Sequence, residues 1–367
     1  MALNDHLTQI ESNISSTLKL SEDLILKAWA KATWDFGKKE AYFSRFMGHG
    51  SGSVIQVYED LSRGKGTSIE IPLILPLEGA GVTEDNPLEE NEERMHYRAC
   101  KVELGRVRNA VRLKGRFEEQ KTKLNMRSDM RKLLSQWLGR YIDLSLFAIL
   151  TGVNPPFKTV STSIPYTVES PSKNRIVVPD GVTIGNTLAA TENSITAPKV
   201  FTADLIGKAR RLAQSNELRA VQPIRIDGRE TYVMVIDPYQ ARDLRKDTKW
   251  LEAQKHANIR GEKNPIFSGA MGIYEGVVIH EHLRVPRTTN TNSVKVGHAL
   301  FLGAQAAIFA EGSAPRWDEE TFDYGNQYGV SIDRMFGLKK SQFTYEATDT
   351  APTDFGVINV LTSSVDD

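Results

Sequence analysis

Two short stretches of this sequence contain residue types that could do chemistry. The turn Gly64-Lys65-Gly66 has the glycine–lysine pair of a phosphate-binding loop, which also needs a glycine five residues earlier and a Ser or Thr directly afterwards. Glu59 occupies the first of these positions and Gly66 the second. Without the distal glycine the backbone cannot wrap a phosphate, and without the hydroxyl there is no magnesium ligand. We therefore interpret this stretch as a flexible turn.

The stretch His280-Glu281-His282 is the best candidate for a metal site. Alternate residues of a strand share a face, so the two histidines could bind one ion, but the spacing places no third ligand nearby. Asp237 follows a predicted strand, where a catalytic carboxylate could lie, yet Pro238 makes a helix N-cap the simpler interpretation. No nucleophile, base and orienting group occur together, so we predict no enzymatic activity, no metal site and no cofactor.

Composition limits the classes of function. The 367 residues contain 46 Lys and Arg against 46 Asp and Glu, so the field of the whole chain attracts neither DNA nor an anionic membrane. A single cysteine, Cys100, excludes an internal disulfide and a cysteine-based zinc cluster. No apolar run approaches the roughly 18 residues of a membrane helix, and the polar N-terminus lacks a signal-peptide core. We expect an unexported chain with two or three lobes.

A proline-bearing strand is the clearest predicted element. Residues 68–77 alternate with period two, which predicts a strand with one buried face. Pro72 and Pro76 lie along one edge of this strand and leave the other edge free to pair. We expect residues 54–60 to be the partner across a short turn. The apolar side chains of the strand are Ile69, Ile71, Leu73, Leu75 and Leu77.

The chain returns from this strand through a basic segment. Residues 100–113 alternate as a strand whose phase shifts at Gly105, which a β-bulge would explain. The preceding residues 84–93 are acidic, so the two stretches could neutralise each other within one chain or face solvent. Alternatively, neighbouring subunits arranged head to tail could use them to set their register. The charged residues concerned are Glu89, Glu90, Glu92, Glu93, Arg106, Arg108, Arg112 and Lys114.

Helices and strands alternate irregularly along the chain, which predicts an α+β fold. The predicted helices are residues 21–47, 116–150 and 202–217 and a shorter one after Asp237, and residues 153–198 form an irregular connection. The predicted strands are PIRIDG, TYVMVI, GVVIHEH and HALFLGAQAAIFA, followed by the tail strands YGVSIDRMFGLKK and FGVINVLTS. The tail is expected to return to the first lobe.

These elements occur in a specific order. With the stretches YFSRFMG, IQVYEDLSRGKGTSIEIPLILPLEG, NAVRLKG, PIRIDGRETYVMVIDPYQARDLR, NPIFSGAMGIYEGVVIHE, LFLGAQAAIFA and FDYGNQYGVS, the chain resembles a family of tailed-bacteriophage major capsid proteins, over about residues 24–360. That family is the N4-like group with the Hong Kong 97-type capsid fold. The resemblance implies an N-terminal arm over 1–47, an extended E-loop hairpin over 48–115, a peripheral domain with a spine helix over 116–199, an axial domain over 200–330, and a tail over 331–367 returning to the peripheral domain.

The resemblance also implies a function. The chain would form hexamers and pentamers of an icosahedral shell around phage double-stranded DNA, with a separate scaffolding protein and a portal. It would be a virion component assembled in the host cytoplasm, without sequence-specific DNA binding and without a membrane. An encapsulin-like compartment shell or a prophage-derived capsid protein is the nearer alternative, and an α+β enzyme is the distant one.

The hairpin suggests where copies would touch. An isolated two-stranded hairpin is marginally stable in water, so we expect its apolar face to lie on another subunit. The predicted contact residues are Ile69, Ile71, Pro72, Leu73, Leu75, Pro76, Leu77, Glu89, Glu90, Glu92, Glu93, Arg106, Arg108 and Arg112.

Overall fold

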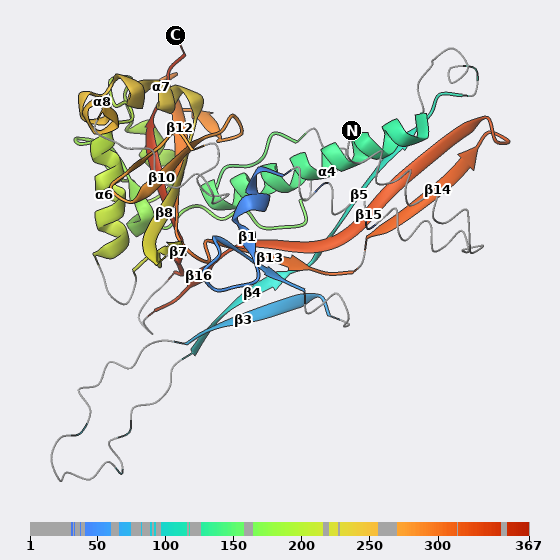
Figure 1. Ribbon diagram of the computed structural model, residues 1–367, viewed down its shortest axis with the longest axis horizontal. Coiled ribbons are helices and arrows are strands. Elements are labelled where there is room, and N and C mark those ends of the chain that lie inside the picture. Colours follow the sequence, from blue (N-terminus) through green and yellow to red (C-terminus); the bar gives the residue numbers. More distant parts are fainter. Residues whose placement is uncertain are drawn as a thin grey trace. The chain divides into compact units, whose positions relative to one another are not determined.

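The chain divides into two units that interleave along the sequence. The first contains residues 1–41, 106–141 and 313–335, and the second contains residues 42–105, 142–312 and 336–367. Figure 1 draws the computed structural model of the protein. The structure describes residues 31, 33, 37, 41–59, 66–74, 82, 89, 92, 97–115, 117, 126–157, 164–215, 220–226, 228–255, 270–313, 315–345 and 351–366.

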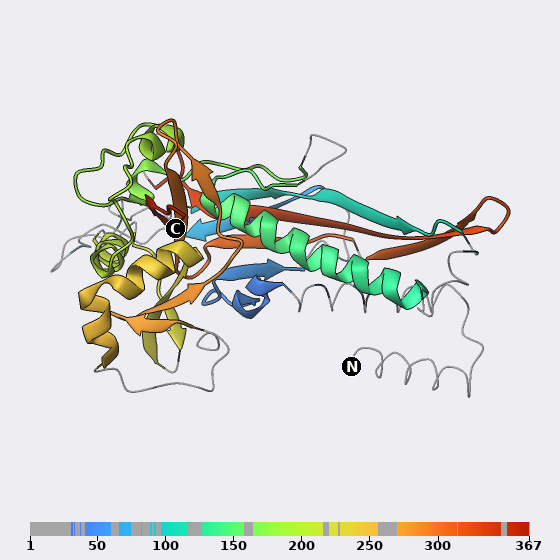
Figure 2. The same ribbon diagram turned by 90° about the horizontal axis from the view of Figure 1, so that it is seen from above.

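The first unit combines a small sheet with the first part of a long helix. β15 (Gln327–Lys340) pairs antiparallel with β14 (Arg316–Phe322), and it also pairs with β5 (Gly105–Arg112). One face of these strands is buried, at Val107, Trp317, Val330 and Ile332. Both views show α4 (Met126–Thr151) running alongside β5 and β15 (Figure 1 and Figure 2).

The helix α4 changes character along its length. Met130, Leu134 and Leu138 are buried at a spacing of four residues, whereas Leu133 is exposed, so one stripe of the first part packs. Every residue from 141 to 151 is buried. The prediction of a helix that is polar in its first half and apolar in its second is confirmed over residues 126–150. Of residues 116–125, the structure describes only Phe117, which is helical.

An eight-stranded sheet forms the larger part of the second unit. Its strand order is β6-β18-β12-β8-β10-β9, with β11 paired to β12 and β7 to β8. The bounds are β6 (Ile176–Val177), β7 (Ile224–Ile226), β8 (Arg229–Ile236), β9 (Gly272–Tyr274), β10 (Val277–Glu281), β11 (Arg287–Thr289), β12 (Lys295–Leu302) and β18 (Val357–Ser363). Nearly every residue of the central strands β8, β10, β12 and β18 is buried, which suits strands that are covered on both faces.

Helices lie beside this sheet. They are α5 (Leu188–Asn193), α6 (Ala203–Gln214), α7 (Pro238–Lys246) and α8 (Thr248–Lys255), and η3 (Lys173–Arg175) is a short 3₁₀ turn (Figure 1). Two of them, α6 and α7, start where the sequence predicts them, whereas α5 and α8 were not predicted. Asp237 is the N-cap of α7, accepting from Tyr239 N at 3.1 Å, and Gln240 completes a capping box. The N-cap interpretation of Asp237 is therefore confirmed. Asp247 caps two helices at once, because its Oδ2 accepts from Ala203 N and its Oδ1 from Lys249 N.

The remaining strands of the second unit form smaller groups around β2, in the β3–β4 hairpin and in the β16–β17 pair. β2 (Ile55–Tyr58) is parallel to both β1 (Met47–Gly48) and β13 (Ala307–Glu311), and β13 pairs with the end of β15. β3 (Ser68–Ile74) and β4 (Tyr97–Glu103) form an antiparallel hairpin. β16 (Gln342–Phe343) and β17 (Thr353–Asp354) form a short pair, and η1 (Tyr42–Phe46) precedes β1.

The expected pairing of residues 54–60 with the proline-bearing strand is wrong. Both edges of β2 are occupied, by β1 on one side and β13 on the other. In this position the side chains of Ile55 and Val57 are buried in the core. β3 pairs instead with β4, with Ile71 opposite Cys100. The prediction relied on the short distance in sequence between residues 54–60 and β3, whereas the observed pairing with β4 is set by tertiary packing.

One further expectation about a strand and one about a helix are corrected. The stretch HALFLGAQAAIFA is not one strand, because residues 303–306 separate β12 from β13 in a different sheet. Gly303 makes this corner possible, since a Cβ there would lie 2.4 Å from the carbonyl oxygen of Gln222. The predicted helix over 21–47 does not continue to Gly48, because residues 42–46 form the 3₁₀ turn η1. Residues 31, 33 and 37 are helical, and the rest of that prediction lies outside the described residues.

The tail is divided between the two units. Residues 327–335 of β15 lie in the first unit. β18 pairs with β12 and with β6, which falls within the range 116–199 expected for the peripheral domain. All seven residues of β18 are buried, which suits a strand inside a sheet. β14 and the start of β15 belong to the first unit and not to an axial domain over 200–330. Among the described helices, none is long and apolar enough to cross a membrane.

Candidate functional site

The hairpin of β3 and β4 presents one apolar face and one polar face. Ile71, Cys100 and Val102 are buried in a cluster with residues of the same chain, among them Ile308 and Phe343. Ile71 is only 7% exposed, so no neighbouring subunit is needed to cover it. This corrects the expectation at Ile71 that the apolar face must lie on another copy. Ile69 is partly buried against the same cluster.

The opposite face of the hairpin is open to solvent. Glu70 and Pro72 are exposed on β3, and Lys101 and Glu103 are exposed on β4. The strand register places Glu70 opposite Lys101 and Pro72 opposite Ala99. Pro72 has no N–H to donate, so at this position the strand offers no ladder donor to a third strand. The exposed face is therefore suited to side-chain contacts.

The predicted contact residues beyond this hairpin are only partly described. Glu89 and Glu92 are both exposed. Leu75, Pro76, Leu77, Glu90, Glu93 and the side chain of Leu73 lie outside the described residues. For these residues the expected contact with a neighbour stays a prediction.

The predicted basic residues lie together on the exposed face of β5. Arg106 binds Asp333 of β15 through its Nε, at 3.0 and 2.9 Å from the two carboxylate oxygens, and through a second N–H. This hydrogen bond raises the pKa of the Arg106 guanidinium. Arg108 lies 3.8 Å from the same carboxylate, and its side chain is 61% exposed. Arg112 lies over the ring of Phe322, with its guanidinium carbon 4.2 Å from the ring centroid.

One carboxylate cannot neutralise this row. Asp333 has a side chain that is 9% exposed and serves both Arg106 and Arg108, while Arg112 donates to the neutral amide of Gln327. Lys114 is exposed at the end of the strand. Asp318 of β14 also acts on the charge of Arg106, so the exposed cations that an acidic partner could match are Arg108, Arg112 and Lys114.

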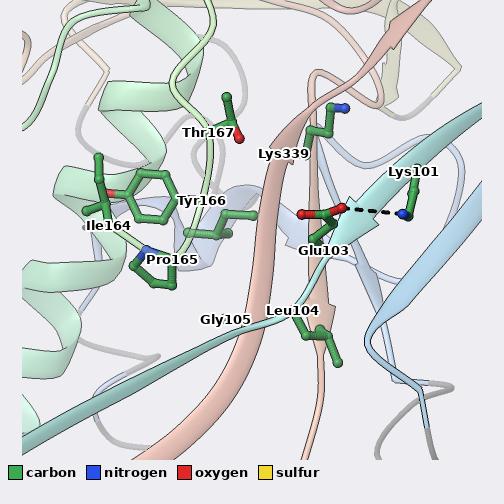
Figure 3. A pocket seen from close by; sticks show the side chains of 10 residues that line it. Lys101, Glu103, Leu104, Gly105, Ile164, Pro165, Tyr166, Thr167 and Lys339 are labelled. Carbon is green, nitrogen blue, oxygen red and sulfur yellow. Dashed lines mark ion pairs between the residues drawn. The ribbon is translucent and has the colours of Figure 1, made fainter.

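A cavity of about 470 Å³ lies at the base of the hairpin (Figure 3). Lys101 and Glu103 of β4 line the cavity and form an ion pair at 3.3 Å. Lys339 of β15 also lines it. Here the backbone of Gly105 passes close to Pro165, where a Cβ would lie 2.0 Å from the proline Cβ. The close approach to Pro165 leaves no space for a side chain, which explains why residue 105, where the alternation of the strand shifts, is a glycine.

Tyr166 is the aromatic residue in the lining of this cavity. Tyr166 is 9% exposed, and burial raises the pKa of its phenol to about 12. In Figure 3 its hydroxyl points away from Lys101 and Glu103. The lining of the cavity therefore combines the ring of Tyr166 with the ammonium groups of Lys101 and Lys339 and the carboxylate of Glu103.

Two buried polar clusters have no counterpart in the sequence-based prediction. Lys340 and Asp354 form an ion pair of 3.0 Å with side chains that are 1% and 0% exposed. Asp143, which is fully buried, binds Arg284 and accepts from the backbone N–H groups of Tyr42 and Phe43. Each cluster joins residues more than ten positions apart in sequence, so spacing alone gives no signal for it.

The histidines of the metal candidate do share one environment, and it is aromatic. His280 lies edge-on to Phe46 with ring centroids 5.5 Å apart, and His282 stacks on Tyr42 at 4.1 Å. Burial, with the positive charges of Arg284 and Arg45, lowers the pKa of His282 to about 4. Within the part of the chain that the structure describes, no three His, Cys, Asp or Glu residues are grouped to hold a metal ion.

Comparisons with known proteins agree over nearly the whole chain. A family model described as phage capsid protein matches residues 17–366. The major capsid protein of Pseudomonas phage KPP25 is 30% identical over 375 residues, which cover 97% of this chain and 99% of that protein.

Solved capsid structures are similar as well. The capsid of Ralstonia phage GP4 has a TM-score of 0.75 and 27% identity, covering 89% of this chain and 92% of that one. The cyanophage Pam1 capsid has a TM-score of 0.69 and 23% identity, covering 90% and 93%. The capsid of Helicobacter pylori bacteriophage KHP30 has a TM-score of 0.63 and 16% identity, covering 88% and 91%. The last two show likeness of fold alone.

Proposed function

We propose that this chain, which belongs to the phage capsid protein family and is a major capsid protein with the Hong Kong 97-type fold, forms hexamers and pentamers of a closed icosahedral shell around phage double-stranded DNA. The observation that carries this proposal is the match to a family model over residues 17–366. The chain is thus a structural component of a virion. A separate scaffolding protein, a portal and assembly in the host cytoplasm belong to the same proposal.

The charge balance supports an enclosure that does not adhere to its contents. The chain has 46 basic and 46 acidic residues, so its overall field gives DNA no general attraction. We propose that the DNA is held without sequence-specific contacts. Shells without DNA but with a protein cargo would instead favour a compartment shell.

Electron microscopy of the purified full-length chain tests the proposal directly. Closed particles of uniform diameter are the expected result, because a shell protein must carry complementary surfaces on every copy. Mass photometry over a range of protein concentrations gives the oligomeric state independently. A chain that stays monomeric at every concentration, both alone and with the scaffolding protein, would contradict the proposal.

We assign part of the contact between copies to the exposed basic residues of β5. Arg106, Arg108 and Arg112 are all exposed, and Asp333 of the same chain binds Arg106 closely and lies 3.8 Å from Arg108. The acidic run over 84–93, of which Glu89 and Glu92 are described and exposed, has the matching charge. Individual exposed pairs contribute about 0–1 kcal/mol, but a ring of subunits repeats them, and charge complementarity also speeds association.

Reversing two of these charges is expected to slow assembly. The double variant Arg108→Glu and Arg112→Glu should assemble about tenfold more slowly at low salt, with the difference shrinking as salt screens the charges. Light scattering during assembly measures the rate. The matched control is Arg225→Glu with Arg229→Glu, which makes the same charge change on exposed residues of β7 and β8. Equal rates for the two double variants would refute the assigned contact.

A further inference from the structure

One carboxylate attaches the start of η1 to the rest of the second unit. The two oxygens of Asp143 accept from Tyr42 N at 2.9 Å and from Phe43 N at 3.2 Å. Arg284 forms an ion pair with the same carboxylate, which is fully buried. Because the first N–H groups of a helical turn have no partner within it, this carboxylate fixes where the turn begins.

Aromatic rings complete the attachment. The ring of Tyr42 stacks on His282 with centroids 4.1 Å apart and planes at 29°, and it also stacks on Phe147 at 6.3 Å. Phe43 is fully buried and lies 4.7 Å from Phe147. His282 and Phe147 face each other at 5.3 Å. The imidazole therefore lies in the same stack that holds the first residue of η1.

The hydrogen bond of His282 requires a neutral ring. Its Nδ1 accepts from Arg284 N at 3.2 Å, so this nitrogen carries a lone pair. A proton on Nδ1 would point an N–H at another N–H and would end the bond. Protonation would also place a positive charge beside two arginines, Arg284 and Arg45.

The groups around this imidazole come from each element packed against it. Arg284 follows in the same turn, and His280 lies on β10. Arg45 lies on η1, with its guanidinium carbon 4.9 Å from the centroid of the Tyr42 ring, and Asp143 lies on α4. Two of these groups are permanently positive, and the carboxylate of Asp143 is already engaged by Arg284 and two backbone N–H groups.

We propose that His282, stacked on Tyr42 and accepting from Arg284 N, is an acid-sensitive latch that holds the start of η1 at neutral pH and releases it when the ring is protonated. The latch consists of Tyr42, Asp143, His282 and Arg284. The proposal concerns this chain's own residues and does not depend on the proposed contact between copies.

The sign of the pH dependence follows from the two titrating groups. Burial lowers the pKa of His282 from 6.5 to about 4, so the latched form binds this proton less readily than the released form. The latch is fully stable above pH 6.5 and weakens as the pH falls from 6.5 towards 4. Asp143 has the opposite sign, because burial raises its pKa and its protonation favours the latched form. A variant at His282 separates the two.

Hydrogen exchange of the full-length chain tests the latch. Peptides covering residues 42–46 would be followed by mass spectrometry at pH 7.5 and pH 5.5, with the intrinsic pH dependence of exchange removed. With the two pKa values of His282, linkage predicts that protection of the Tyr42 and Phe43 amides falls about tenfold at pH 5.5. No change in protection would overturn the proposal.

Three variants assign the effect to one ring. His282→Phe keeps a ring for stacking and cannot be protonated, so its protection should be the same at both pH values. Should that variant not fold, His282→Asn keeps an oxygen acceptor for Arg284 N and should also lose the pH dependence. His49→Phe replaces a histidine whose side chain is 69% exposed and should behave as the unmodified chain does. A pH dependence that survives in the His282 variants would place the responsible proton elsewhere.

Discussion

Replacing Lys340 with methionine is expected to lower the free energy of unfolding by about 3–5 kcal/mol, because it would leave a buried carboxylate without its counter-charge. The Nζ of Lys340 lies 3.0 Å from Oδ1 of Asp354, and the two side chains are 1% and 0% exposed. The ammonium also donates to the carbonyl oxygens of Glu169 and Ser170, each at 3.3 Å. Urea unfolding of the full-length chain measures the loss.

The neighbouring lysine provides the control. Lys339 has a side chain that is 29% exposed and lies 3.9 Å from Glu169, so Lys339→Met should cost less than about 1 kcal/mol. Combining Lys340→Met with Asp354→Asn should recover part of the loss, because the amide removes the buried charge and its single oxygen can still accept from Ser172 N. Equal losses for Lys339→Met and Lys340→Met would contradict this explanation.

Gly105→Ala is expected to cost roughly 3 kcal/mol or more, because the added methyl group has no space. Its Cβ would lie 2.0 Å from the Cβ of Pro165 and 2.5 Å from the proline carbonyl oxygen (Figure 3). The carbonyl belongs to the backbone, so it cannot rotate away as a flexible side chain could. The expected result is a lower melting temperature in differential scanning calorimetry.

Gly52 provides the control, which distinguishes a steric clash of the added methyl group from a general effect of replacing a glycine. A methyl group added at Gly52 would meet no atom within 4 Å, so Gly52→Ala should leave the melting temperature within about two degrees of the unmodified chain. A Gly105→Ala variant as stable as Gly52→Ala would show that the strand and the segment around Pro165 can move apart.

Local patterns predicted the elements better than their partners. The alternation over 68–77 identified β3, and the Asp237–Pro238 pair identified the start of α7, because both signals lie within a few residues. The partner of β3 was mistaken, because turn length alone favoured residues 54–60. Whether β2 pairs with β3 or with β13 depends on residues near 307, which no local pattern includes.

The contact surface shows the same limit. The sequence identified Arg106, Arg108 and Arg112 as a basic stripe, and the structure places them on one exposed face. It could not identify Asp333 as the internal partner of Arg106, because 227 positions separate them. The burial of Ile71 depends likewise on distant residues such as Phe343. At Ile71, the hairpin face that was expected to need a neighbour is covered by the chain's own core.

The place of β18 inside the eight-stranded sheet has a consequence for biosynthesis. Asn359 pairs with Ile176, and Val360 pairs with Ala299, so this strand lies between segments that the ribosome makes much earlier. At roughly 5–20 residues per second, β6 waits on the order of ten seconds for its partner. An edge of β6 lacks its partner for that interval, and an edge of β12 for only the last few seconds of it, so both could pair with other nascent copies. The yield of folded subunits should therefore depend on the rate of translation between these strands.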